Sequence, residues 1–353
     1  MNRRLRTAIG ILLSILLLWW ALRDVSFAEV ASRIRSAEPL PFALAIAVTV
    51  GGFWFRAVRW GVLLLPAFGT LPMRPRMAAT FIGFAANNLL PARVGEFARA
   101  FSLSRLTPVP TSAALATLVI ERILDGIVLL GFLFLAMASS GFPATGELGG
   151  PDLRTAALTV AGFITLLTLG LGMSVASPRL AARTGRAAIR LLPGRLHDPA
   201  LEALRGFAQG LGVLRRPRLF FASAVLAIGQ WGFLALSFLF AFRAFGIDDV
   251  PFSGAVFLQS LISLAVAIPS SPGFFGPFEA AARFGLGLWN VPADQAISFA
   301  IGFHIGGFIP VTVIGVYYVW RLELRWAEVR HSEEAVDDEM HHGPDTATSP
   351  SSP

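Results

Sequence analysis

The chain has 353 residues, of which 55% are hydrophobic and only 14% charged, and its formal net charge is +7. A soluble domain carries about 25% charged residues, so this composition excludes an ordinary soluble protein and indicates an integral membrane protein. The chain lacks cysteine and lysine, which excludes disulfides and the Walker A loop of an ATP-driven motor. Its basic residues adjoin apolar segments, where they are expected to meet anionic lipid headgroups and not nucleic acid.

The chain begins with "MNRRLRTAIGILLSILLLWWAL", a basic start followed by an apolar core. No small-residue cleavage site follows it, so we expect a retained transmembrane helix and not a removed signal peptide. The tail from 323 to 353 is acidic and rich in Pro and Ser, which predicts a disordered cytoplasmic segment that includes His341 and His342. The apolar runs long enough to span a bilayer are 7–22, 40–65, 111–139, 153–175, 219–242 and 295–320.

Two further apolar segments, 77–106 and 253–288, are broken near their middles by proline, glycine and polar residues. Nine arginines occupy the loop 177–218 and three precede the first span, so the positive-inside rule places both regions in the cytoplasm. The N-terminus and the loop 177–218 lie on the same side of the membrane only if the segment 77–106 enters the membrane and leaves it again on the side from which it entered. The same argument makes 253–288 re-entrant if "RLELRWAEVR" at 321–330 is cytoplasmic, and it predicts that both chain ends are cytoplasmic.

The sequence therefore predicts an all-α polytopic membrane protein with six full transmembrane helices and two re-entrant segments of opposite orientation. The two broken segments, "LLPARVGEFARAF" and "AIPSSPGFFGPFEAAARF", share an order of aliphatic residues, proline, glycine, phenylalanine and glutamate. Discontinuous helices at matching places are typical of inverted-repeat transporters, whose site lies between the halves. Two ordinary proline-kinked helices are the alternative. The membrane domain would cover 1–322, with one repeat at about 5–140 and the other at about 153–322.

Charged residues in the first broken segment must face inward, because each one exposed to lipid costs about 2.5–3.5 kcal/mol. On the next helix Glu121 and Asp125 share a face and repel unless a cation lies between them, for which Arg93 and Arg99 are candidates. These residues either form a buried ion network that pins the turn, or cradle a phosphate together with the backbone N–H groups of a half-helix starting near Gly95. The candidate substrate-binding residues are Asn87, Asn88, Arg93, Glu96, Arg99, Glu121, Arg122, Asp125, Ser270, Ser271, Glu279 and Arg283.

The polar residues of the two broken segments differ in charge. Arg93, Glu96 and Arg99 sum to plus one, whereas the residues of the second segment sum to zero, so an anionic headgroup should prefer the first half. No catalytic residue, metal site or cofactor is predicted. His304 is interpreted as a hydrogen-bonded helix residue, with proton coupling as the alternative. The arginines that line one face of the cytoplasmic loop, and are expected to bind anionic lipid, are Arg179, Arg183, Arg186 and Arg190.

Three motifs, "NNLLPARVGEFARAF", "ERILD" and "PSSPGFFGPFEAA", resemble the signature of the lysylphosphatidylglycerol synthase transmembrane region, also called the flippase-like domain family. The resemblance covers roughly residues 5–325. It implies a flippase-like membrane domain without the soluble aminoacyl-transferase domain of the full-length synthases, so their synthetic activity is not carried over. The positions that match the family motifs are Asn88, Pro91, Arg93, Gly95, Glu96, Arg99, Glu121, Arg122, Asp125, Pro272, Gly273, Gly276 and Glu279.

The leading hypothesis is a transporter, not an enzyme, that moves an anionic lipid between the leaflets of the cell (inner) membrane. Its substrate would be a phospholipid or a polyprenyl-phosphate-linked lipid. One alternative is a membrane-embedded lipid-modifying transferase with Glu96 or Asp125 as general base. The other is a non-transporting scaffold that recruits a separate lipid-modifying enzyme through its arginine-rich loop and tail.

Overall fold

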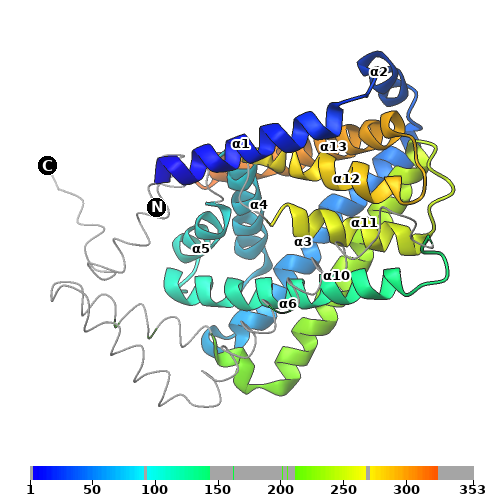
Figure 1. Cartoon of the computed structure of the whole chain (residues 1–353). Coiled ribbons are helices and arrows are strands. Elements are labelled where there is room, and N and C mark those ends of the chain that lie inside the picture. Colours follow the sequence, from blue (N-terminus) through cyan, green and yellow to red (C-terminus); the bar gives the residue numbers. More distant parts are fainter. Residues whose placement is uncertain are drawn as a thin grey trace, which may run out of the picture.

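The computed structural model describes residues 3–90, 94–143, 211–267 and 271–324, together with the single positions 162, 201 and 205. Throughout these ranges the regular structure is helical (Figure 1). The expected span 153–175, the four arginines from Arg179 to Arg190 and the acidic tail beyond 324 lie outside them. The helices are α1 (Arg3–Leu22), α2 (Phe27–Arg35), α3 (Pro39–Phe68), α4 (Met73–Leu89), α5 (Gly95–Leu106), α6 (Thr111–Met137), α10 (Pro217–Ala244), α11 (Phe252–Ala265), α12 (Pro277–Gly287) and α13 (Ala293–Arg321), with 3-10 turns η3 (Leu211–Arg215) and η4 (Pro272–Phe274).

Three of these helices, α3, α10 and α13, are long and apolar enough to cross a membrane, as the runs 40–65, 219–242 and 295–320 predicted. Helices α1 and α2 are together long and apolar enough for a fourth span, but a bend of 84° between them makes the pair either a broken span or a re-entrant loop. Helix α6 has 27 residues, but its three central charges set it apart from an ordinary apolar span. Large apolar side chains on the outer surface, such as Phe221 and Trp320, suit contact with lipid tails.

Both broken segments fold back on themselves. Helix α4 ends at Leu89 and packs against α5, while α11 ends at Ala265 and packs against α12. The helices of each hairpin approach closely through glycine: a Cβ on Gly95 would collide with the carbonyl oxygen of Gly83, and one on Gly285 would press on Leu258. The two helices of each broken segment therefore lie against each other and do not form one continuous kinked helix.

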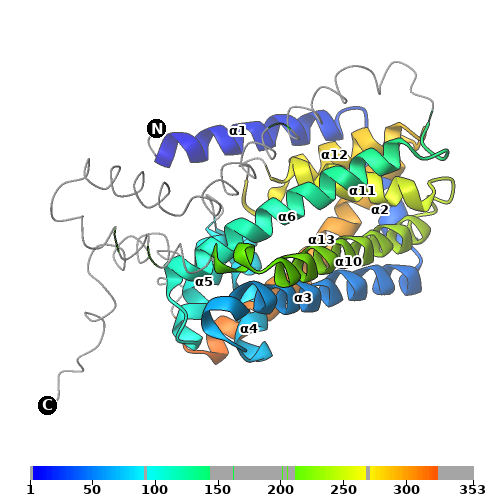
Figure 2. The ribbon, with the colours of Figure 1, turned by 90° about the horizontal axis from the view of Figure 1, so that it is seen from below.

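The two halves of the molecule use the same set of helix contacts. Helix α3 lies along α10, α4 packs on α13 as α11 packs on α6, and α5 packs on α6 as α12 packs on α13 (Figure 2). Helices α3 and α10 run in opposite directions: the N–H of Glu38, before α3, donates to the carbonyl of Ala244 at the end of α10 (2.9 Å), whereas Leu63, late in α3, belongs to the apolar cluster on which Leu219, early in α10, packs. If α3, α4, α5 and α6 are matched with α10, α11, α12 and α13, each of these contacts in one half has a counterpart in the other.

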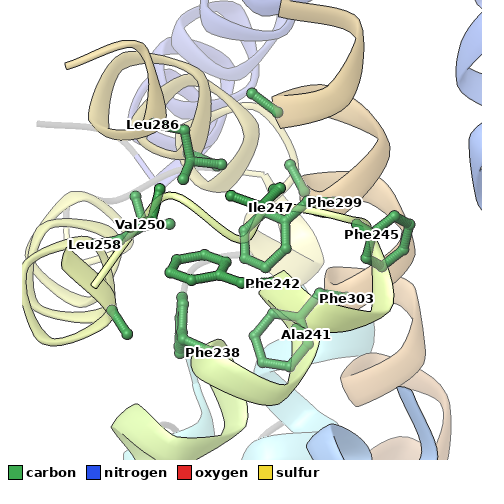
Figure 3. Packing of buried hydrophobic residues seen from close by; sticks show 14 of the residues in the cluster. Phe238, Ala241, Phe242, Phe245, Ile247, Val250, Leu258, Leu286, Phe299 and Phe303 are labelled. Carbon is green, nitrogen blue, oxygen red and sulfur yellow. The ribbon is translucent and has the colours of Figure 1, made fainter. Parts of the chain in front are cut away.

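The largest apolar cluster joins α10 to α13 (Figure 3). Phe238, Phe242 and Phe245 recur at intervals of four and three residues, so they share one face of α10. They meet the rings of Phe299 and Phe303, with centroids 5.2 Å apart for Phe242 and Phe299 and 4.9 Å apart for Phe238 and Phe303. This cluster fixes the second half as one packed unit behind its hairpin.

Helix α1 lies across the break of the second hairpin. The Ser14 hydroxyl accepts a hydrogen bond from the backbone N–H of Ser271 (2.7 Å), and a Cβ on Gly276 would collide with the Ser14 carbonyl. Gly276 also has φ +100°, a conformation that L side chains rarely adopt. Helix α1, at the start of the chain, thus covers residues 271–276, which come late in the sequence.

We expect Gly95→Ala to destabilise the protein by about 1–3 kcal/mol, because its methyl group would collide with the Gly83 carbonyl and the Asn87 amide. Gly131→Ala in α6 is the matched control, since a Cβ there finds no atom within 4 Å. Thermal unfolding in detergent micelles measures both variants. Equal melting temperatures for the two would contradict the close hairpin packing.

Candidate functional site

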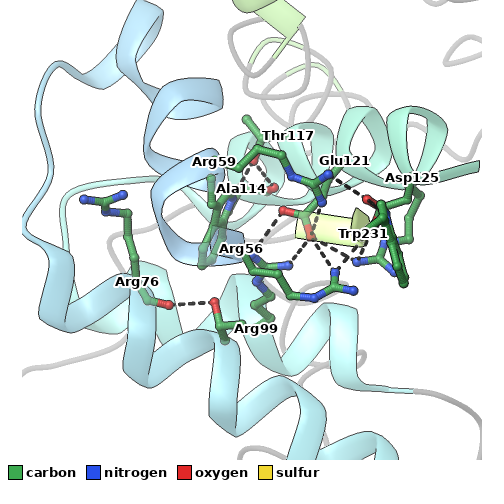
Figure 4. A network of polar contacts seen from close by, with 12 residues as sticks. Arg56, Arg59, Arg76, Arg99, Ala114, Thr117, Glu121, Asp125 and Trp231 are labelled. Atoms are coloured by element: carbon green, nitrogen blue, oxygen red, sulfur yellow. Dashed lines mark hydrogen bonds and ion pairs between the residues drawn. The ribbon is translucent and has the colours of Figure 1, made fainter. Parts of the chain in front are cut away.

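Four arginines surround one buried carboxylate, that of Glu121 in α6 (Figure 4). Arg99 of α5 donates to both of its oxygens, at 2.7 Å and 3.1 Å, and the neighbouring Arg122 contacts it at 3.0 Å. Arg56 and Arg59 of α3 each bring a guanidinium nitrogen to 3.5 Å from the same oxygen. Three helices therefore converge on a single acidic side chain, which is fully buried.

Asp125, one turn further along α6, extends this arginine cluster. It accepts hydrogen bonds from Arg59 (2.6 Å) and from the indole N–H of Trp231 in α10 (2.8 Å). Arg56 and Arg122 lie 3.5 Å from its other oxygen. The second carboxylate thus connects α10 to the helices that Glu121 already holds.

Aromatic rings enclose two of the guanidiniums. Arg99 lies 4.2 Å from the ring centroid of Trp60, and Arg56 lies 5.0 Å from Phe84 and 5.2 Å from Trp231. A cation over a ring face is attracted electrostatically, and the ring also excludes water and lipid from that side. These contacts keep the arginines extended inside the bundle.

The arginine cluster carries more positive than negative charge. Four guanidiniums, the buried ones of Arg56, Arg59 and Arg99 and the 41% exposed one of Arg122, face the two carboxylates of Glu121 and Asp125, which leaves an excess of two positive charges. Half-buried Glu96 is close enough to attract Arg122 electrostatically, which reduces that excess to one. Among the described residues, Nε and Nη2 of Arg59 and Nε of Arg99 are buried without a hydrogen-bond partner. Such donors in a dry, positive environment favour an anion.

Local sequence explains how the site is assembled. Arg56 and Arg59 are three residues apart on α3, and Glu121 and Asp125 four apart on α6, so each pair lies on one helix face. Arg99 lies near the start of half-helix α5, whose first N–H, that of Gly95, donates to the Asn87 side chain (2.8 Å). The asparagine on α4 therefore holds the half-helix that carries Arg99.

The predicted site residues separate into two groups. Arg99, Glu121, Arg122 and Asp125 come together in the arginine cluster, with Glu96 nearby. Asn87 and Asn88 lie at the end of α4, where Asn88 donates to the Thr312 hydroxyl on α13 (2.8 Å). The candidates Arg93 and Ser270 lie outside the described residues.

The second group belongs to the other hairpin. Glu279 accepts a hydrogen bond from the N–H of Gly276 (2.6 Å) and contacts Nδ1 of His304 (2.7 Å). Ser271 is bound to Ser14. Arg283 donates to the carbonyls of Trp20, Ala21 and Arg23 at the end of α1, so it stabilises that helix end and does not join the arginine cluster.

Sequence reasoning missed Arg56, Arg59 and Trp231. A signal was present in "FRAVRW" at 55–60, where two arginines interrupt the middle of an apolar run. Two such charges in a span require inward-facing partners, and Glu121 and Asp125 were the acidic residues that lacked them. The partner cations of these acids lie on α3 as well as in the broken segment, about 65 residues before them in the sequence.

The fold and site define a class: a multi-pass helical membrane protein with two helical hairpins and a buried arginine cluster. The sequence matches the family model described as "Lysylphosphatidylglycerol synthase TM region" over residues 7–315, and the chain belongs to this family. The resemblance drawn from the three motifs is thereby confirmed.

Relatives in archaea are similar over most of this chain. A protein named "Glycosyltransferase AglD" from Haloferax volcanii is 27% identical over 96% of the chain, which spans 59% of that protein's length. A "UPF0104 membrane protein" from Methanothermobacter thermautotrophicus is 25% identical over 88% of the chain and 91% of its own length. Another with that family name, from Methanocaldococcus jannaschii, is 23% identical over 67% of the chain and 94% of its own length.

We expect Glu121→Gln to lower the free energy of unfolding by about 3–5 kcal/mol, because it removes the negative charge that four guanidiniums contact. Glu96→Gln is the control and should cost less than about 1 kcal/mol, since Glu96 is only half buried. The free energy of unfolding of both variants is measured by titration with sodium dodecyl sulfate, with tryptophan fluorescence as the signal. A loss for Glu121→Gln no greater than for the control would contradict the central role of this carboxylate.

Proposed function

We propose that this protein is a lipid transporter that moves an anionic lipid, phospholipid or polyprenyl-phosphate-linked, between membrane leaflets. The observation that carries the proposal is the excess of positive charge in the buried arginine cluster. A charge inside a bilayer is costly, so an unneutralised arginine there indicates a functional partner. A phosphate group supplies the missing negative charge and accepts from several guanidinium donors at once.

Arg56 is the proposed contact for the phosphate. Both of its ion-pair distances, to Glu121 and to Asp125, are 3.5 Å, whereas Arg59 and Arg99 have contacts of 2.6 Å and 2.7 Å. Arg56 is therefore the least firmly held of these three cations. Rotation of its side chain toward a ligand breaks no short hydrogen bond. The Nε–H groups of Arg59 and Arg99, which have no hydrogen-bond partner among the described residues, supply further donors on the same cluster.

The matching contacts of the two halves support an inverted repeat around the site. Because α3 and α10 are antiparallel, a twofold axis relating the halves runs across these helices and lies in the membrane plane when they span it. The two hairpins then enter from opposite sides and correspond to re-entrant segments. Rocking of one half against the other would expose the arginine cluster to each leaflet in turn.

The membrane orientation follows from arginine distribution. Three arginines precede the first span and nine occupy the loop 177–218, so both chain ends and this loop are proposed to face the cytoplasm. The membrane would then be the cell (inner) membrane. Arginines at the cytoplasmic surface and arginines in the cluster would both favour a lipid with an anionic headgroup.

The proposed transport predicts that Arg56→Gln lowers the rate of anionic lipid translocation about tenfold, equivalent to about 1.4 kcal/mol. Arg105→Gln is the matched control, an exposed arginine at the end of α5 that lies over Phe101. Translocation of fluorescent phosphatidylglycerol and of a polyprenyl-phosphate sugar is measured in proteoliposomes by access of a membrane-impermeant reagent. Wild-type rates in Arg56→Gln for both lipids would remove this assignment.

A transferase is the second candidate, because one relative carries a glycosyltransferase name. Against this activity, Asp125, one of the two candidate general bases, accepts hydrogen bonds from Arg59 and Trp231 and is not poised to take a proton. Incubation of the purified chain with a polyprenyl phosphate and a sugar nucleotide, followed by mass spectrometry, tests it. We expect no glycosylated lipid, and formation of one that Asp125→Asn abolishes would favour the transferase.

A further inference from the structure

We propose that Glu279 and His304 form a proton-binding site in the second half, and that its occupancy sets the position of the second hairpin. This inference rests on the proposed transport function and assigns the proton as the coupling ion. The proton adds to an imidazole nitrogen of His304, and no other covalent bond forms or breaks. The site then changes from a net charge of minus one to zero.

The pair is buried inside the helical bundle. Nδ1 of His304 lies 2.7 Å from one carboxylate oxygen of Glu279, and the two residues are 9% and 1% exposed. The imidazole stacks on Phe278 at 4.2 Å and lies 4.7 Å from Phe275. The Glu279 carboxylate accepts the N–H of Gly276 but, among the described residues, has no cation beside it while the imidazole is neutral, and a bound proton supplies one.

In the first half, a contact between the half-helix and the long helix that follows it has the opposite polarity. There the half-helix α5 carries the cation Arg99 and the long helix α6 carries the acid Glu121. In the second half, α12 carries the acid Glu279 and α13 carries the base His304. An arginine keeps its charge under all physiological conditions, whereas imidazole gains or loses a proton near neutral pH. The second half is therefore the half that can respond to protons.

Glu279 connects the proton to the break of the hairpin. Its other oxygen accepts the N–H of Gly276, the residue before α12, so the same carboxylate caps the half-helix and contacts His304. Phe275 and Phe278, which flank Gly276, both contact the imidazole ring. A change in the charge of the pair consequently acts on the half-helix where it begins.

Other ionisable groups on the elements that pack against α12 and α13 are engaged or lie elsewhere along the helices. Helix α11 and residues 10–22 of α1 have none. Arg283 binds main-chain carbonyls of α1, Asp294 binds the N–H of Ser26, and Glu29 pairs with Arg33 within α2. The remaining groups are Arg3, Arg4 and Arg6 at the start of α1, Arg23 and Asp24 after α1, Arg35 of α2, Arg56 and Arg59 in the arginine cluster, Arg74 and Arg76 at the start of α4, Arg218 and Arg243 near the ends of α10, and Tyr317, Tyr318 and Arg321 at the end of α13.

Spin labels can follow the second hairpin, because the chain has no cysteine of its own. Gly287→Cys at the end of α12, where a side chain meets open space, and Val313→Cys on the exposed face of α13 provide the pair. We expect the distance distribution to shift between about pH 8 and about pH 5. Glu279→Gln, whose amide oxygen can still accept from Gly276, and His304→Gln should each abolish the shift.

Ser14→Ala is the matched control, since it removes a hydrogen bond at the same break without removing a titratable group. It should keep the pH-dependent shift. A distance distribution that is the same at both pH values, or a shift that survives in Glu279→Gln and His304→Gln, overturns the proton site.

Translocation of fluorescent phosphatidylglycerol in proteoliposomes, with and without a pH difference, tests the coupling. The translocation rate of the wild type should change with the pH difference. Glu279→Gln should still move lipid, but at a rate that does not depend on the pH difference. A rate in Glu279→Gln that follows the pH difference as in the wild type overturns the coupling. Absence of lipid movement at every pH counts against the proposed transport, and the spin-label distances then decide the proton site independently.

Discussion

The contact of one carboxylate, Glu121, with four guanidiniums is the constraint on which the first half depends. The arginines come from α3, α5 and α6 itself, so these helices cannot separate without exposing charge to lipid. Arg99 reaches Glu121 because α4 breaks after Leu89 and returns as α5, and the return is close because Gly83 and Gly95 have no side chains. The broken helix is thus a means of delivering a cation to a buried acid.

The two halves have matching helix contacts but differ in the charge of the buried side chains that these contacts bring together. Each places a charged or titratable side chain near the start of a half-helix against a partner in the following long helix, Arg99 against Glu121 and Glu279 against His304. The first arrangement is permanently charged and carries spare hydrogen-bond donors, which suits an anion. The second contains an imidazole, which suits a smaller and exchangeable ligand. Asn88 and Thr312 join the halves at the level of the first break.

Sequence was sufficient for features that depend on local chemistry. Proline and glycine marked both breaks, and apolar length marked α3, α10 and α13, because these signals act within a few residues. The roles of Arg56, Arg59 and Arg283 were not found, since each is set by partners distant in sequence: Asp125 for Arg59, and the carbonyls that end α1 for Arg283. The short helix α2 was also missed, although Ser26 as N-cap and the Glu29–Arg33 pair are recognisable signals.

The position of α1 across the second break has a consequence for how the protein is made. Ser14 emerges from the ribosome near the beginning of synthesis, whereas its partners Ser271 and Gly276 emerge more than two hundred residues later. Throughout that time α1 resides in the membrane without the surface it finally covers. The docking of α1 on residues 271–276 therefore waits until the second hairpin has been made.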